Sequence, residues 1–310
     1  MNIVLLDAKT MGDGIDLGIF SKYGNLQIYD TTTNDEKISR SKDADIIITN
    51  KVVFDKDTLK SLPKLKLICL LATGMNNIDL DFAKQQGIEV KNVAGYSTKS
   101  VAQHTFALVL SLANRLNFYD NYVKDDMWVK SEVFTNLDNI FYEMSGKRWG
   151  IIGLGAIGHE VAKIATAFGC EVFYHSTSGI KRDEIYKELS LKELLKTSDV
   201  VSIHAPLNEK TRNILDKEEL SLMKQNAILV NVGRGGIINE NALRETIEKE
   251  KIYVGLDVLE VEPMSVNSPL RNLTHKERFI ITPHVAWGSI EARERLVKMV
   301  CKNIENFLKV

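Results

Sequence analysis

The stretch Trp149-Gly-Ile-Ile-Gly-Leu-Gly-Ala-Ile-Gly158 consists of a short apolar run, Trp149–Ile152, followed by a glycine-rich turn, Gly153–Gly158. A helical pattern follows over residues 159–168. Such an apolar run is typical of a buried strand in a parallel sheet. Gly153 allows a tight turn, Gly155 lets the backbone approach a pyrophosphate, and Gly158 lets helix and strand pack closely. Free N–H groups at the start of the helix attract the anion. The stretch therefore predicts a dinucleotide-binding unit, and its plainer interpretation is a packing loop without a ligand.

Five further strand candidates follow this turn, separated by helical stretches. Each is a short apolar run that ends in polar residues, Gly or Pro, as buried parallel strands do. The six candidates are Trp149–Ile152, Glu171–Tyr174, Val200–His204, Ala227–Val232, Ile252–Leu256 and Phe279–Thr282. Six strands with helices between them match a complete dinucleotide-binding sheet, so this half of the chain predicts a doubly wound parallel sheet.

The first 97 residues show the same alternation and predict a second open α/β sheet. Its strand candidates are Ile3–Leu6, Asp45–Thr49, Leu67–Ala72 and Ile88–Asn92, with amphipathic stretches such as Lys56–Leu62 and Asp79–Gln86 between them. A chain of 310 residues exceeds one ordinary core, so two domains are expected.

Two long helical patterns, Ser97–Asn117 and Ser289–Val310, accompany the predicted sheets. Between the first of them and the glycine-rich turn lies the less periodic, aromatic-rich stretch Phe118–Tyr142. It predicts a loop and a covered surface. A subunit interface is the second interpretation, because aromatic residues are enriched at interfaces.

The composition excludes several classes of protein. The 40 Lys and Arg nearly balance the 41 Asp and Glu, giving a formal net charge of −1, and no basic stripe indicates nucleic acid or an anionic membrane. The longest apolar stretch, Thr105–Ala113, is far shorter than a membrane span. Cys69, Cys170 and Cys301 lack metal-ligand spacing and predict buried free thiols and no metal site. The residues after Met1 lack the features of a leader, so a cytoplasmic protein is expected.

Three polar residues with complementary chemistry follow three of the predicted strands. Arg234 lies in Ile228-Leu-Val-Asn-Val-Gly-Arg-Gly-Gly236, Glu262 in Leu256-Asp-Val-Leu-Glu-Val-Glu-Pro263, and His284 in Ile280-Ile-Thr-Pro-His-Val-Ala-Trp287. The carboxyl ends of parallel strands converge where such sheets bind ligands. A cation, a carboxylate and a proton carrier at that edge form a reaction centre, which predicts an enzyme.

Hydride transfer to a 2-oxo acid requires these three functions. A cation anchors the substrate carboxylate and polarises the carbonyl, which suits Arg234. A general acid protonates the carbonyl oxygen, which suits His284, whereas His104 lies inside a predicted helix and is a weaker candidate. A carboxylate orients that acid and stabilises its cationic form. Spacing favours Glu262 only mildly for this function over Glu260, and Asp257 is a third candidate.

The predicted cofactor site lacks the acid that usually binds the adenosine ribose. That carboxylate is expected at the end of the second strand, about 20 residues after the glycines, where His175-Ser-Thr-Ser-Gly179 stands instead. A carboxylate would repel a 2′-phosphate, whereas the hydroxyl of Ser176 would not. Lys181 and Arg182 are either phosphate ligands or the solvated start of a helix. The sequence therefore allows NAD(H) or NADP(H).

Five ordered motifs resemble the D-isomer-specific 2-hydroxyacid dehydrogenase family over essentially the whole chain. They are Gly153–Gly158, His204-Ala-Pro-Leu207 with Thr211, Asn231-Val-Gly-Arg-Gly-Gly236, Leu256–Pro263 and Thr282-Pro-His-Val-Ala-Trp287. Within the family, Gly95–His104 and Pro283–Trp287 look most like glycerate dehydrogenases, also called hydroxypyruvate reductases.

The resemblance implies a specific set of site residues. It selects Arg234, Glu262 and His284 as the catalytic set, with Arg234 and His284 also binding substrate. It implies that Leu71–Met75 supplies backbone N–H groups to the substrate carboxylate, through Thr73, Gly74 and Met75. The implied cofactor contacts are Gly153, Gly155, Ala156, Ile157, Gly158, His175, Ser176, His204, Ala205, Pro206, Thr211, Val232, Gly233 and Asp257, the last beside the nicotinamide.

The resemblance also implies an architecture. Two doubly wound parallel-sheet α/β domains are expected, with a Rossmann cofactor domain (residues 98–285) inserted in a flavodoxin-like substrate domain (residues 1–97 and 286–310). Family members are typically homodimers, so a homodimer is expected, with the helix and loop after residue 97 in the interface and the C-terminal helix folded onto the first domain.

The resulting hypothesis is an oxidoreductase that acts on the CH–OH group of its donor. It would transfer a hydride between NAD(H) or NADP(H) and a small D-2-hydroxy acid or 2-oxo acid, with hydroxypyruvate or glyoxylate as the expected substrate. Two alternatives stay open. One is a nucleotide-sensing scaffold that resembles the family's corepressor branch, and the other is a dehydrogenase for bulkier 2-oxo acids.

Overall fold

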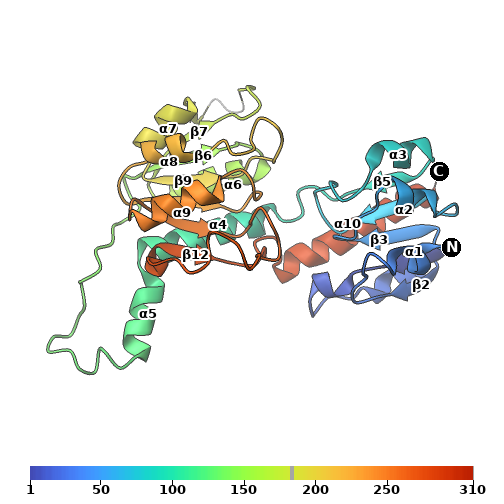
Figure 1. Cartoon of the computed structure of the whole chain (residues 1–310), viewed down its shortest axis with the longest axis horizontal. Coiled ribbons are helices and arrows are strands. Elements are labelled where there is room, and N and C mark those ends of the chain that lie inside the picture. The colour runs from blue at the N-terminus through green and yellow to red at the C-terminus, as the bar shows by residue number, and fades with distance from the viewer. Residues whose placement is uncertain (182–184, 310) are drawn as a thin grey trace. The chain divides into compact units, whose positions relative to one another are not determined.

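The computed structural model describes residues 1–181 and 185–309, which form two compact units. The first unit comprises Met1–Ser97 and Trp287–Val310, and the second comprises Thr98–Ala286. Each unit is built around its own parallel sheet (Figure 1). The predicted fold class, two doubly wound α/β sheets, is confirmed.

The first unit contains a five-stranded parallel sheet of order β2-β1-β3-β4-β5, the strand order of a flavodoxin-like fold. Its strands are β1 (Asn2–Leu5), β2 (Asn25–Ile28), β3 (Ile46–Thr49), β4 (Leu67–Leu70) and β5 (Glu89–Lys91). Its helices are α1 (Lys37–Ser41), α2 (Lys56–Lys60), α3 (Leu80–Gln85) and α10 (Ile290–Leu308), with 3₁₀ helices at Ala8–Met11 and Gly18–Tyr23.

Both faces of this sheet are covered because its strands carry apolar residues on each side. Ile3 and Leu5 of β1 belong to one core together with apolar side chains of α10. Val4 belongs to a second core, which includes residues of α2 and α3. The alternation along β1 assigns these cores to opposite faces of the sheet.

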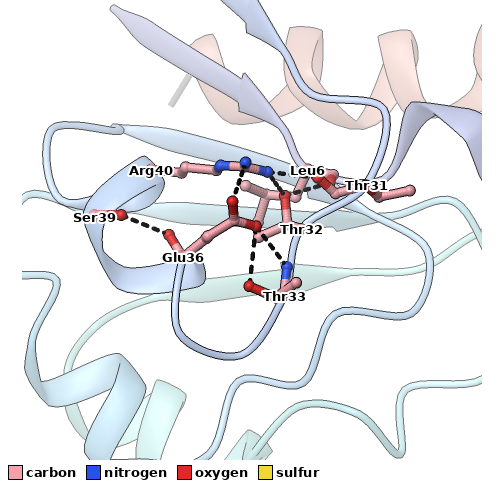
Figure 2. A network of polar contacts seen from close by, with 7 residues as sticks. All are labelled: Leu6, Thr31, Thr32, Thr33, Glu36, Ser39 and Arg40. Atoms are coloured by element: carbon pink, nitrogen blue, oxygen red, sulfur yellow. Dashed lines mark hydrogen bonds and ion pairs between the residues drawn. The ribbon is translucent and has the colours of Figure 1, made fainter.

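A polar network fixes the connection from β2 to α1 (Figure 2). Arg40 pairs with Glu36 at 2.6 Å and also donates to the hydroxyl of Thr32 at 2.9 Å. Glu36 in turn accepts from the backbone N–H and the hydroxyl of Thr33, and these bonds lower the pKa of its carboxyl. Thr32 donates to the backbone carbonyl of Leu6, so the network ties this loop to the end of β1.

The second unit contains a seven-stranded sheet of order β12-β11-β10-β9-β6-β7-β8, in which every pair is parallel. Its strands are β6 (Arg148–Ile152), β7 (Glu171–His175), β8 (Lys187–Glu188), β9 (Val200–Ile203), β10 (Ala227–Asn231), β11 (Ile252–Leu256) and β12 (Phe279–Ile281). Its helices are α4 (Thr98–Ala113), α5 (Leu116–Lys124), α6 (Ala156–Ala167), α7 (Leu191–Thr197), α8 (Lys217–Leu222) and α9 (Glu240–Glu248), with a 3₁₀ helix at Lys276–Arg278.

Glycines mark where helices approach the second sheet. A Cβ at Gly150 of β6 would lie 2.5 Å from Leu194 of α7, and a Cβ at Gly255 of β11 would lie 3.1 Å from Leu108 of α4. Trp149, the neighbour of Gly150, points to the opposite side and packs on Phe106 of α4 with ring centroids 4.8 Å apart. The helices α4 and α7 therefore cover opposite faces.

Two strands and one helix differ from the sequence prediction. Neither β2 nor β8 was predicted, because β2 is an exposed edge strand of mixed polarity and β8 has only 2 residues. The stretch Phe118–Tyr142 was predicted as a loop and a covered surface. Its first part instead belongs to α5, where Phe118 and Tyr122 stack one helical turn apart. The covered surface is also wrong for the single chain, since Phe134 is 88% exposed.

Cys69, Cys170 and Cys301 are free and buried, as predicted. Across residues 1–181 and 185–309, no helix has the length and apolar character needed to cross a membrane. In the same part of the chain, no three His, Cys, Asp or Glu residues gather in a way that could hold a metal ion.

Candidate active site

The three predicted catalytic residues follow three neighbouring strands of the second sheet. Arg234 comes after β10, Glu262 after β11 and His284 after β12, and these strands are adjacent in the order β12-β11-β10. Because all three strands are parallel, their carboxyl ends lie at the same edge of the sheet. This edge is where open α/β sheets bind ligands.

His284 and Glu262 are in direct contact. The Nδ1 atom of His284 lies 2.7 Å from Oε2 of Glu262, while Oε1 of Glu262 accepts a hydrogen bond from the backbone N–H of Leu259 at 3.0 Å. The carboxylate therefore holds the imidazole through Nδ1 and leaves Nε2 to exchange a proton with a ligand. The His284 side chain is 27% exposed, so it can be reached from solvent.

The other two acidic candidates have different partners. Glu260 pairs with Arg212 at 3.0 Å, and its backbone N–H donates to Glu240 at 2.7 Å. Burial raises the pKa of the Glu240 carboxyl, and the negative charges of Glu260 and Glu262 raise it further.

Asp257 is 1% exposed, and its carboxylate accepts from the backbone N–H groups of residues 285 and 286. Glu262 is thus the acidic candidate that the structure brings to the imidazole of His284.

Arg234 lies in a turn that the strand before it holds in place. The side chain of Asn231, the last residue of β10, accepts from the N–H of Gly233 at 3.0 Å and donates to the carbonyl of Arg234 at 2.8 Å. A Cβ at Gly235 would lie 1.8 Å from the carbonyl oxygen of Leu259, so this turn packs closely against the loop that leads to Glu262. The Arg234 guanidinium donates to the carbonyl of Gly233 at 2.8 Å, which leaves N–H groups for a carboxylate.

The glycine-rich turn between β6 and α6 has the geometry of a pyrophosphate cradle. Gly153 has a φ of 92°, and a Cβ there would lie 2.8 Å from the backbone nitrogen of Ala205. A Cβ at Gly158 would lie 2.5 Å from the carbonyl of Gly153. By contrast, a Cβ at Gly155 would meet no atom within 4 Å, so space is open directly in front of α6, which begins at Ala156. Tight packing at two glycines and open space at the middle one suit a dinucleotide.

The other predicted cofactor residues lie at the same edge of the sheet. His175 ends β7, and its Nδ1 atom lies 3.2 Å from the carbonyl of Leu189; the buried Ser176 follows it. Lys181 lies further along this connection, whereas Arg182 is outside the described residues. The strands β7 and β9 lie on either side of β6, so the chain reverses its winding at the glycine-rich turn, which is where such sheets bind dinucleotides.

His204 directly follows β9 and is unsuited to proton transfer. Its Nε2 atom lies 3.0 Å from the hydroxyl of Ser202, and burial lowers the pKa of its imidazole to about 3. The ring is therefore neutral. Thr211 stabilises the loop that follows β9, since its hydroxyl donates to the carbonyl of Pro206 at 2.6 Å. Ala205 of this connection and Val232 after β10 are both buried.

The predicted substrate loop lies in the first unit, directly after β4. The hydroxyl of Thr73 donates to the carbonyl of Val93 at 2.8 Å, and the side chain of Asn92 donates to the carbonyl of Thr73 at 2.6 Å. These bonds hold the start of Thr73–Met75 at the carboxyl edge of the first sheet.

In the second unit, two residues of α4 that contact the loop carrying His284 were not predicted from the sequence to be functional. Ser100 and His104 of α4 bond to Ala286 and Thr282, on either side of His284. Their spacing of four residues places them on one helical face, which was the available signal. Nothing in the sequence showed which loop that face would meet.

The open space at Gly155 gives a direct test of the cradle. Gly155 has a φ of −88°, which alanine tolerates, so Gly155→Ala should fold normally. The added methyl group would stand where the pyrophosphate approaches and should raise the Kd of the nicotinamide cofactor about tenfold, since such overpacking costs about 1–3 kcal/mol. Fluorescence titration measures the Kd.

Gly158→Ala provides the matched comparison. Its Cβ would overlap the carbonyl of Gly153, so this variant should lose thermal stability, whereas Gly155→Ala should not. A Gly155→Ala protein that binds the cofactor as tightly as the wild type would contradict the assignment of the cradle.

Comparison with known proteins places this geometry in a family. The model of the D-isomer specific 2-hydroxyacid dehydrogenase NAD binding domain matches residues 106–286. Hydroxypyruvate reductase from Blautia hydrogenotrophica is 35% identical over 100% of this chain and 97% of the relative. The structure of D-lactate dehydrogenase from Aquifex aeolicus, complexed with NAD and lactic acid, is 30% identical with a TM-score of 0.85, covering 100% of this chain and 96% of that one. An acyclic imino acid reductase in complex with NADPH and D-Arg is also 30% identical, with a TM-score of 0.88, covering 100% and 97%.

These matches span the glycine-rich turn and the three strand ends that carry Arg234, Glu262 and His284. They identify an oxidoreductase with a nicotinamide-cofactor domain that acts on 2-hydroxy acids or 2-oxo acids. This chain belongs to the D-isomer specific 2-hydroxyacid dehydrogenase family.

Proposed function

We propose that this enzyme reduces a small 2-oxo acid, hydroxypyruvate or glyoxylate, to the hydroxy acid, with His284 as the acid/base and Arg234 as the substrate anchor. The observation that carries the proposal is the 2.7 Å contact between His284 and Glu262, at the sheet edge that also carries Arg234. The relative named hydroxypyruvate reductase, which aligns with the whole chain, supports the substrate.

The mechanism follows from the chemistry of these side chains. When bound, the nicotinamide ring supplies the hydride that reaches the carbonyl carbon. Arg234 binds the substrate carboxylate through its guanidinium and stabilises the negative charge that develops on the carbonyl oxygen. His284 donates its Nε2 proton to that oxygen, and in the oxidative direction it accepts this proton back. Glu262 holds the ring through Nδ1 and stabilises the cationic form that precedes proton transfer.

We assign substrate binding also to the first unit and cofactor binding to the second. The backbone N–H groups of Thr73, Gly74 and Met75 contribute to binding the substrate carboxylate. The bonds from Asn92 and to Val93 support this assignment, because they fix the start of the loop. In the second unit, the open space at Gly155 supports a cofactor pyrophosphate in front of α6.

A panel assay tests the proposed function. Oxidation of NADH and of NADPH is followed at 340 nm with hydroxypyruvate, glyoxylate, pyruvate and a bulkier branched 2-oxo acid, and chiral chromatography identifies the product. Turnover of the two small acids to the D-isomer, or to glycolate from glyoxylate, supports the proposal. Preference for the branched acid would replace the substrate, and binding of cofactor without turnover of any acid would favour a nucleotide-sensing scaffold.

The end of β7 gives a prediction on cofactor choice. His175→Asp places a carboxylate where the ribose of the adenosine is expected, which should favour NADH through its 2′-hydroxyl and repel the 2′-phosphate of NADPH. The ratio of kcat/KM for NADPH to that for NADH should fall about tenfold, the effect of about 1.4 kcal/mol. His175→Asn, which adds no charge, is the control. An unchanged ratio in both variants would place the adenosine ribose elsewhere.

We further propose a homodimer in the cytoplasm. The stretch from α5 to residue 142 carries exposed apolar side chains, with Val129 84% and Phe134 88% exposed. Exposed apolar patches of this kind mark protein–protein contact sites, and a second copy of the chain is the proposed partner. Sedimentation equilibrium of the wild type and of Phe134→Asp tests the dimer, and cell fractionation tests the location.

A further inference from the structure

The loop that carries His284 has an unusual backbone. His284 has a φ of 55°, in the left-handed region that side chains with a Cβ rarely adopt. Such a conformation persists when the surrounding structure determines it. The contacts around Thr282–Ala286 are therefore part of how the imidazole reaches its position.

Asp257 bonds to three successive backbone N–H groups of this loop. Its carbonyl accepts from the N–H of His284 at 2.9 Å. Its carboxylate accepts from Val285 at 2.9 Å and from Ala286 at 2.8 Å. Since the Asp257 side chain is 1% exposed, these bonds are shielded from water and fix the loop closely.

Thr282 links this buried carboxylate to a second histidine. Its hydroxyl lies 2.5 Å from the Asp257 carboxylate and 2.9 Å from Nε2 of His104. A hydroxyl has only one proton, and the carboxylate oxygen can only accept. Thr282 therefore donates to Asp257, and His104 must donate its Nε2–H to Thr282. The same nitrogen lies 3.6 Å from the Asp257 carboxylate, so His104, Thr282 and Asp257 form one compact polar cluster.

Ser100 completes the contact from the same helix. It lies one turn before His104 on α4, and its hydroxyl donates to the carbonyl of Ala286 at 2.6 Å. One face of α4 thus holds both ends of the loop, at Thr282 and at Ala286, with His284 between them.

We propose that His104 is a positioning residue for catalysis. It acts through Thr282 and Asp257 to keep the imidazole of His284 within hydrogen-bond distance of Glu262. This inference rests on the proposed role of His284 as the acid/base. His104 contacts neither His284 nor Glu262 among the bonds that the structure describes; it sets the loop from which the imidazole extends. Displacement of a reacting group by about 1 Å can lower a rate by about 100-fold, so this support has a measurable effect.

Variants at His104 and Thr282 test the proposal. His104→Leu removes the donor, and Thr282→Val removes the hydroxyl that joins the two groups. Both should lower kcat about tenfold while the KM for the cofactor stays near the wild-type value. His104→Gln, whose amide can donate to Thr282, and Thr282→Ser should recover most of the rate. Gln103→Leu, on an exposed neighbouring position of α4, is the matched control and should leave kcat unchanged.

A second readout separates positioning from stability and from the proposed function. Ring resonances of His284 in NMR spectra report its contact with Glu262 without turnover, and they should shift in His104→Leu but return in His104→Gln. The proposal fails if both His104 variants keep the wild-type kcat and resonances, or if only their thermal stability falls. Inactivity of the wild type on every 2-oxo acid would count against the proposed function, while the NMR comparison would still decide the role of His104.

Discussion

Replacing His284 with asparagine should lower kcat for 2-oxo acid reduction by about 10²–10⁴-fold, the usual contribution of general acid–base catalysis. Asparagine does not titrate, so it cannot deliver the proton to the carbonyl oxygen. It also tolerates the left-handed backbone at this position, where φ is 55°, so the loop should keep its shape. Steady-state kinetics measure the loss of rate, and the Kd of the cofactor should stay close to the wild-type value.

His275→Asn is the matched control for this prediction. His275 lies near Glu277 and Glu250, at 3.3 Å and 3.9 Å, and follows no strand of the sheet. Its replacement should leave kcat unchanged. If His284→Asn kept a kcat within a factor of about three of the wild type, equivalent to less than 1 kcal/mol, His284 would not be the acid/base.

The buried strands could be predicted because two covered faces demand a continuous apolar run. The stretch Ala227–Val232 contains β10, whose residues are all buried. An edge strand has no such demand: β2 reads Asn-Leu-Gln-Ile and buries none of its residues fully. The limit at α5 is different, because this short helix has no buried residue and opens a longer stretch, up to residue 142, that lacks a regular helix.

The positions of Arg234 and His284 could be predicted because each follows the end of a short apolar run that forms a strand, β10 for Arg234 and the half-buried β12 for His284. Spacing favoured Glu262 over Glu260 only mildly, because both belong to a loop without regular geometry. The structure distinguishes them by their partners, since Glu260 contacts Arg212 and Glu262 contacts His284. Only the family resemblance had selected Glu262 at the level of sequence.

His104 illustrates a different limit. Its place inside a helix was predicted correctly, and that place made it a weak candidate for the proton carrier. Its contact with Thr282 depends on how α4 packs on the sheet, which helical spacing does not determine. A residue that supports a site through tertiary contacts has no local pattern that identifies it.

Replacing Arg234 with lysine should lower kcat/KM for the 2-oxo acid by about 10–100-fold. Lysine keeps the charge but cannot form the two-pronged bond of a planar guanidinium with a carboxylate. Loss of one hydrogen bond to a charged group costs about 1.5–3 kcal/mol, which corresponds to this range. Steady-state kinetics at several substrate concentrations measure the effect, and Arg212→Lys, which changes the cation beside Glu260, is the matched control.

The division of this loss between KM and kcat shows which function Arg234 performs. An arginine that only anchored the carboxylate would bind ground state and transition state equally, and its replacement would raise KM without changing kcat. An arginine that also stabilises charge on the carbonyl oxygen acts more strongly in the transition state, so kcat should fall as well. Because Arg234 leaves the sheet at β10, beside the strand that leads to Glu262, we expect both changes. If the Arg234→Lys variant had the kcat and KM of the wild type, Arg234 would not belong to the reaction centre.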